Sequence, residues 1–200
     1  HLAGAVNGAA VCRGTTFLKD CMEKPVFNNK VTIVDDPLRK RGLRSKAFDG
    51  EGLATCRKNI VERGILKTWI LDLRSARQLN LDSTANASRG TSSPPAPAST
   101  NLYLEPGEIS PEDMIGEIKS GLYVTGLMGQ GANLITGDYS RGAEGFWIEN
   151  GAIAYPVSEL TIAGNLGNMF KDLIAADDLI FRFGTNAPTL RINGMTVAGK

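Results

Sequence analysis

The sequence predicts an α+β fold with an N-terminal helix, a mixed middle and a β-rich, antiparallel C-terminal half. Three observations support this. Residues 2–18 are rich in Ala and Gly with scattered Val and Leu, as in a packed helix. Residues 123–127, 146–148 and 153–157 alternate in the way that is typical of strands. Asn150-Gly151 separates the last two of these segments and is a strong signal for a tight hairpin.

The middle of the chain combines short strand patterns with loops. Val31 and Ile33 alternate, which predicts a strand, and a second strand is expected around Trp69–Asp72. The run Arg39–Lys46 is basic, but no aromatic residues interleave with its charges, so we interpret it as a solvated loop and not as a phosphate-binding patch. Residues 83–107 are dense in Ser, Thr, Pro and Ala, which predicts one long loop of a kind that is often functional.

Two more helices and a closing pair of strands are expected in the C-terminal half. Ser110 is a suitable N-cap, Pro111 fits the first helical position, and Gly121 is expected to end that helix. A further helix is expected within residues 165–179. Residues 187–200 predict two short strands around a second Asn-Gly pair.

Composition excludes several classes of protein. The formal net charge of +1 gives no global field that favours nucleic acid or an anionic membrane, so we expect neither as a direct partner. No apolar run is long enough to span a bilayer. The three cysteines form no CxxC pair and no disulfide framework, which favours a reducing, cytoplasmic compartment with the cysteines as small buried side chains.

The chain starts with His1 inside an expected helix, not with Met. We therefore expect the sequence to be part of a longer protein. His1 is also the only histidine, so neither a zinc site nor a serine or cysteine triad can be assembled from this segment by the usual residues. The glycines of "GLMGQG" (126–131) lack the spacing of a phosphate-binding loop, and Asp49 and Glu51 are interpreted as part of a turn.

The stretch from Thr136 to Gly151 concentrates glycines, charges and aromatic residues. Residues 138–141 are expected to form a polar turn. Phe146 and Trp147 should point to opposite sides of a strand, one into the core and the other toward a groove or a neighbour. From the residues alone, a hairpin with structural glycines is favoured over a binding surface.

These residues resemble a known family. The run "GDYSRGAEGFWIENG", with "VTIVDDP" upstream and "PTLRINGMTVAG" at the end, is similar to the C-terminal signature of the PmbA (TldE) branch of the TldD/PmbA proteins, also called modulators of DNA gyrase. The resemblance covers nearly all 200 residues. It implies that residues 1–200 are a single C-terminal domain of a protein about twice as long.

The resemblance implies a role in a peptidase complex. In that family a TldD-type subunit carries a zinc HExxxH motif and pairs with a PmbA-type subunit to degrade or trim small, unfolded peptides. Here the corresponding start reads "HLAGAV", so that His1 is retained, Leu2 replaces the Glu and Val6 replaces the second His. The late cysteine of the TldD type is also missing from residues 177–190. The resemblance therefore implies a non-catalytic chain, with zinc in the partner subunit and no cofactor of its own.

The same resemblance suggests where partners bind. We expect the hairpin to present a strand edge to an extended peptide or to the partner, which is a TldD-type subunit in a heterodimer or a second copy in a homodimer. The candidate contact residues are Asp138, Tyr139, Ser140, Arg141, Phe146 and Trp147. Two alternatives stay open: a protein-interaction modulator of DNA gyrase, and a homodimeric peptidase with non-zinc chemistry.

Overall fold

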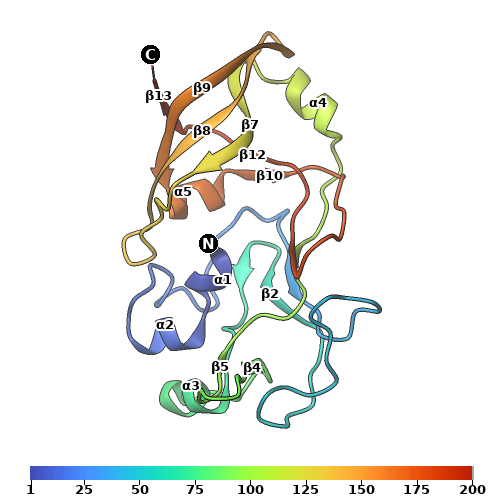
Figure 1. The fold of residues 1–200 in the computed structure, drawn as a ribbon, viewed down its shortest axis with the longest axis vertical. Helices are drawn as coiled ribbons and strands as arrows, with labels where there is room; N and C mark the ends of the chain where they lie inside the picture. The colour runs from blue at the N-terminus through green and yellow to red at the C-terminus, as the bar shows by residue number, and fades with distance from the viewer. Residues whose placement is uncertain (200) are drawn as a thin grey trace.

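The structure is a computed structural model that describes residues 1–199. Figure 1 shows a lower body, which contains the first half of the chain, and an upper β-meander from the second half. A short helix and two short strands of the second half lie between them. The chain is 14% helix and 36% strand with antiparallel sheets in the C-terminal half, so the α+β prediction is confirmed.

The lower body is built on a five-stranded sheet with the order β11-β6-β1-β2-β3. Its strands are β1 (Ile33–Asp35), β2 (Lys58–Glu62), β3 (Ile65–Leu66), β6 (Leu102–Leu104) and β11 (Thr185–Asn186). The central strand β1 pairs antiparallel with both β2 and β6, and all three of its residues are buried. The edge strand β11 pairs parallel with β6 and so returns the C-terminal part of the chain to the lower body.

The stretch 83–107 is not one loop as expected. It contains β6 and a two-stranded sheet made by β4 (Ala87–Ser88) and β5 (Ala96–Pro97). The strand expected at Trp69–Asp72 is also absent: Ile70 makes only an isolated bridge to Asn7. Within residues 1–199 no neighbouring strand pairs with this segment, so the predicted strand does not form.

The N-terminal segment is two short helices and not the single helix that was expected. They are α1 (Leu2–Ala5) and α2 (Gly8–Cys12). Asn7 separates them because its backbone is extended and its side chain accepts a hydrogen bond from Ala9 N, which starts a new helix.

The next two helices start at side-chain caps. In α3 (Leu73–Leu79), Asp72 and Ser75 form a reciprocal capping box. In α4 (Pro111–Gly116), Ser110 accepts from Asp113 N as predicted. This helix ends at Gly116 and not at Gly121, which already lies in the following strand.

The predicted meander is confirmed as a four-stranded sheet with the order β13-β9-β8-β7. Its strands are β7 (Ser120–Met128), β8 (Asp138–Glu149), β9 (Ala152–Asn165) and β13 (Thr196–Ala198). Residues 138–141 are therefore not the polar turn that was expected, because they pair with β9 as the first residues of β8. Asn150 and Gly151 both have positive φ, 49° and 81°, as the tight hairpin requires. At Gly145, a Cβ atom would lie 1.9 Å from Tyr123 O, so only glycine fits against β7 here.

The C-terminal end differs from the predicted pattern. Helix α5 (Leu166–Lys171) is shorter than expected and leads directly into β10 (Leu173–Ala175). β12 (Leu190–Ile192) pairs with β10, whereas β13 pairs with β9. The closing strands are therefore present, but they join two different sheets and do not form a hairpin.

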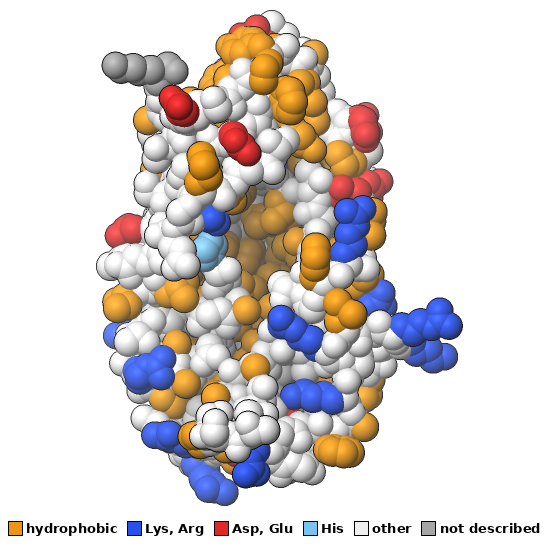
Figure 2. Space-filling view, viewed as in Figure 1, with side chains coloured by type: hydrophobic (Ala, Val, Ile, Leu, Met, Phe, Trp, Pro, Cys, Tyr) orange, Lys and Arg blue, Asp and Glu red, His pale blue; other side chains and the backbone are white. Residues whose placement is uncertain are grey.

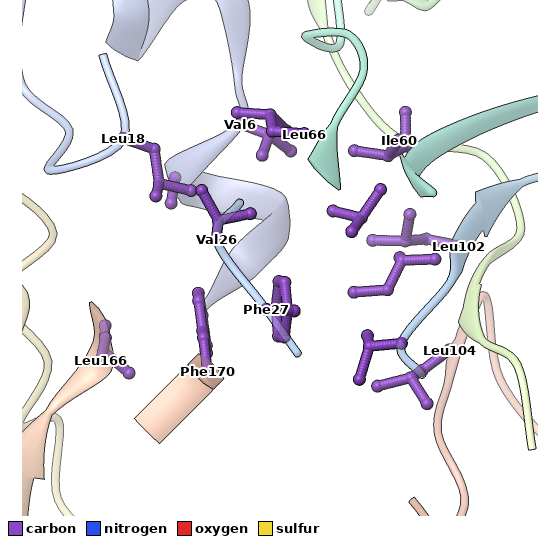
Figure 3. Packing of buried hydrophobic residues seen from close by; sticks show 14 of the residues in the cluster. Val6, Leu18, Val26, Phe27, Ile60, Leu66, Leu102, Leu104, Leu166 and Phe170 are labelled. Carbon is purple, nitrogen blue, oxygen red and sulfur yellow. The ribbon is translucent and has the colours of Figure 1, made fainter. Parts of the chain in front are cut away.

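One hydrophobic core connects the lower body to the root of the meander. Figure 3 shows Phe170 of α5 beside Phe27 of the lower body. Their rings stack with centroids 4.5 Å apart and planes at 15°, and Phe17 packs on Phe170 at 5.9 Å. Val6 and Leu166 belong to the same cluster, so the two parts of the molecule share their buried apolar surface.

A buried polar network ties residues 83–107 to the five-stranded sheet. Asp35 is fully buried and accepts hydrogen bonds from Thr100 N (2.7 Å), Thr100 Oγ1 (2.9 Å) and Asn86 Nδ2 (2.7 Å). Lys58 Nζ lies 4.0 Å from the same carboxylate. Burial lowers the pKa of the Lys58 ammonium, and the negative charge of Asp35 opposes that shift.

Candidate functional site

The three positions that match the HExxxH motif lie in different environments. His1 is exposed and precedes α1, with its ring edge-on to Tyr139 at 5.6 Å. Leu2 is half-buried against the core. Val6 is completely buried in the core and its carbonyl accepts a hydrogen bond from Ile70 N (2.9 Å). The third motif position is therefore occupied by a core side chain and not by a surface group.

The donor atoms of this region do not fit a zinc ion. Neither Leu2 nor Val6 has a side-chain atom that can bind metal, which leaves His1 alone at the motif. Across residues 1–199, no group of three or more His, Cys, Asp or Glu side chains is arranged to hold a metal ion. We therefore assign no chemical step in this chain to a bound metal.

At the start of β8, Asp138 is held by neighbouring polar groups. Thr136 Oγ1 donates to Asp138 Oδ2 (2.6 Å), and Asn165 Nδ2 donates to Asp138 Oδ1 (3.3 Å). Asn165 is also the N-cap of α5, where its Oδ1 accepts from Gly167 N (3.0 Å). The carboxylate of Asp138 thus joins the turn before β8 to the start of α5.

The next three candidate residues differ in exposure. Tyr139 is only 6% exposed and belongs to the core, so its side chain has little free surface for a peptide. Ser140 is exposed. Arg141 is half-buried: its Nη2 donates to Leu127 O at 3.4 Å, and its buried Nε has no hydrogen-bond partner within residues 1–199. The exposed hydroxyl of Ser140 and the unpaired Nε–H of Arg141 are therefore the polar groups that remain without a protein partner within residues 1–199.

Phe146 and Trp147 alternate along β8, but the prediction that one of them enters the core is wrong. Phe146 is 37% exposed, Trp147 is half-buried, and the neighbouring Ile148 takes the buried position. Trp147 lines a groove of about 780 Å³ between the meander, α4 and β12. A volume of this size is sufficient for a small ligand or a short peptide segment.

The six candidate residues do not form one site. Asp138 and Trp147 are nine positions apart on one strand, which corresponds to roughly 30 Å at the normal rise of a β-strand. Asp138 lies beside the start of α5 and Tyr139 beside His1, whereas Phe146 and Trp147 lie toward the hairpin turn. Figure 2 shows that the surface beside the pale-blue histidine is hollowed, with hydrophobic side chains on its floor.

The strand edge that was expected from the stretch 136–151 is not free, because β8 pairs with both β7 and β9. The edge of the meander lies instead at β7. β7 is the last strand of its sheet, and within residues 1–199 no strand pairs with its outer side. Leu127 and Met128 on this strand are 41% and 52% exposed. The alternation of residues predicted a strand here, but it gives no signal of whether a strand is central or at an edge.

Comparisons with known proteins define the class of this chain. The family model described as the PmbA/TldA metallopeptidase C-terminal domain matches residues 1–199. The chain therefore belongs to the PmbA/TldD metallopeptidase family.

Individual relatives agree with this assignment. The chain is 42% identical to Metalloprotease PmbA of Escherichia coli O157:H7 over its whole length. A solved structure of TldE from Thermococcus kodakarensis superposes with a TM-score of 0.88 at 27% identity, covering 99% of this chain. A Thermotoga maritima protein described as a candidate modulator of a DNA gyrase superposes with a TM-score of 0.85 at 34% identity, covering 98%.

The chain spans less than half the length of these relatives. It covers 43% of the Escherichia coli protein, 46% of the Thermococcus chain and 45% of the Thermotoga chain. None of the helices among residues 1–199 is both long and apolar enough to cross a membrane.

The contacts of Asp138 predict a structural role that can be separated from binding. We expect Asp138→Ala to lower the free energy of unfolding by about 1–2 kcal/mol, because the hydroxyl of Thr136 and the amide of Asn165 each lose an acceptor. Urea denaturation measures this change. Ser140→Ala is the control, since its exposed side chain makes no hydrogen bond within residues 1–199. Unchanged stability in Asp138→Ala would contradict the structural role.

Proposed function

We propose that the chain is the C-terminal domain of a longer, cytoplasmic subunit of a TldD/PmbA-type peptidase complex, and that this subunit does not itself cleave peptides. Zinc and the general base are supplied by a TldD-type partner. The partner, together with this subunit, acts on small, extended peptides. The membership of the family supports the type of complex.

The observation that carries the proposal is the environment of the motif residues. Catalysis by an HExxxH motif needs a general base at the second position and a second imidazole at the sixth. Leu2 has no proton-accepting group, and Val6 is buried among apolar side chains. A histidine in place of Val6 would put a polar ring into the hydrophobic core without a hydrogen-bond partner, which is unfavourable. The packing around Val6 therefore does not accommodate the second histidine of the motif.

The edge strand supports the second half of the proposal. A peptide in extended conformation can pair with the outer side of β7 through main-chain hydrogen bonds, which recognise backbone and not sequence. Arg141 lies beside this strand through its contact with Leu127 O. Its Nε–H is buried without a partner within residues 1–199 and would donate a hydrogen bond to a peptide carbonyl that reaches it.

The proposal predicts that cleavage depends on the partner. The full-length protein alone should show no hydrolysis of an unstructured fluorogenic peptide, and addition of a TldD-type subunit should produce hydrolysis that a chelator abolishes. Peptide turnover measured with and without the partner tests this. Activity of the isolated protein that survives chelation would instead favour the homodimeric peptidase with non-zinc chemistry.

Two of the candidate contact residues on β8, Arg141 and Trp147, can be tested in the same complex. We expect the double variant Arg141→Ala, Trp147→Ala to lower kcat/KM for peptide by about tenfold or more, because each side chain supplies roughly 1 kcal/mol of binding free energy. Arg74→Ala, on the exposed surface of α3, is the control. Wild-type turnover in the double variant would exclude these residues as peptide contacts.

A further inference from the structure

A cluster of cations is present on the lower body, away from the meander. The loop after β1 and a second loop around residue 182 enclose a hollow on the surface. Arg39, Lys40, Arg41 and Arg182 line this hollow. Arg44 lies at its rim, against Gly184. Within residues 1–199 none of these five side chains forms an ion pair with a carboxylate. Five cations without counter-charges repel one another, which favours an anionic occupant.

The fold adds aromatic residues that the sequence places far from the basic run. The guanidinium carbon of Arg39 lies 3.4 Å from the ring centroid of Phe181, and Tyr103 contacts the same ring edge-on at 5.1 Å. Phe183 is 70% exposed and Leu43 is 73% exposed at the same hollow. The basic run has no aromatic neighbours in the sequence, which favoured a solvated loop, but the fold brings aromatic residues to it from elsewhere in the chain.

Two buried asparagines hold the loops in place. Asn101 accepts from Arg44 N (3.0 Å) and donates to Ser45 Oγ (2.9 Å). Asn186 accepts from Arg182 N (2.8 Å) and from Phe183 N (2.9 Å). These asparagines are 2% and 7% exposed and lie at the paired strands β6 and β11. The hollow of about 350 Å³ between the loops is therefore fixed by the five-stranded sheet.

The charges of the whole chain are also unevenly distributed, with an excess of cations in the first half and of anions in the second half. Residues 1–100 contain 16 Lys and Arg against 9 Asp and Glu, whereas residues 101–200 contain 6 against 12. On the face shown in Figure 2, Lys and Arg lie mainly over the lower half and Asp and Glu mainly over the upper half. The net charge of +1 conceals this separation, which directs an acidic partner toward the lower body.

We infer that this hollow, formed by residues 39–44 and 181–186, is a docking site for an acidic polypeptide segment that also carries apolar side chains. The cations pair with its carboxylates, and Leu43 and Phe183 pack against its apolar residues. Leu38 and Ile180, 55% and 57% exposed, extend the apolar surface on either side along the chain. This site is additional to the proposed peptide-binding edge and does not depend on it.

The apolar residues favour a polypeptide over a nucleic acid. Single-stranded nucleic acid binds through aromatic rings on which bases stack. Here Arg39 covers one face of Phe181, which leaves Phe183 as the more exposed ring, beside three exposed aliphatic side chains: Leu38, Leu43 and Ile180. Aliphatic side chains pack on other side chains, so the mixture of cations and aliphatic groups matches an acidic, apolar protein segment.

The test uses the full-length protein and a fluorescein-labelled short peptide of alternating Glu and Leu, with binding measured by fluorescence anisotropy. We expect saturable binding that weakens with salt, and no binding of the Lys–Leu counterpart. Lys40→Glu, Arg41→Glu should weaken binding about tenfold or more, and Phe183→Ala should weaken it severalfold. Arg74→Glu, Arg77→Glu on α3 is the matched charge control and should leave the affinity unchanged.

Three results would overturn the inference. The first is no binding of the Glu–Leu peptide by the wild-type protein. The second is binding that is unchanged in both Lys40→Glu, Arg41→Glu and Phe183→Ala, with folding of each variant verified by thermal unfolding. The third is tighter binding of an oligothymidine that is lost in the same variants, which would identify the hollow as a nucleic-acid site.

Discussion

The packing of α5 against the N-terminal half is the interaction on which the rest of the structure depends. Phe170 stacks on Phe27, and Leu166 and Val6 lie in the same core. This contact orients the meander over the lower body, because both parts bury their apolar surfaces in one cluster. It also brings His1 close to Tyr139, so the first residue of the chain lies at the root of the meander.

That packing supports the proposal that this chain does not itself supply the catalytic zinc. The sixth position of the motif supports the core through Val6, and the preceding helix is only four residues long because Asn7 begins the next one. A buried valine contributes stability and supplies no ligand atom to a metal. The proposed functional surfaces lie elsewhere: the free edge of β7, the groove lined by Trp147, and the basic hollow near Phe183.

Turns and helix starts, which depend on residues close together in the sequence, were predicted correctly in several places. Asn150-Gly151 and the alternation around it identified the meander, and Ser110 identified the start of α4. Contacts between distant segments were not predictable in this way. The pairing of β11 with β6 and the stacking of Phe181 under Arg39 join residues that are more than 80 positions apart.

The candidate site was predictable only in part, for the same reason. The structure leaves Arg141 and Trp147 partly accessible. The sequence pattern placed Trp147 on a strand but assigned residues 138–141 to a polar turn, whereas they form the start of β8. It gave no indication that Tyr139 is buried or that Asp138 holds the start of α5, because both depend on β9 and the helix that follows it. Burial and edge position are properties of the assembled sheet.

The measurement that tests the central claim most directly is the metal content of the purified full-length protein alone. Elemental analysis after dialysis without chelator gives the number of zinc ions per chain. The account predicts a value close to zero, since the motif retains His1 but neither of its other two functional residues. About one zinc per chain would contradict it, because the ion would then have a complete set of ligands within this subunit.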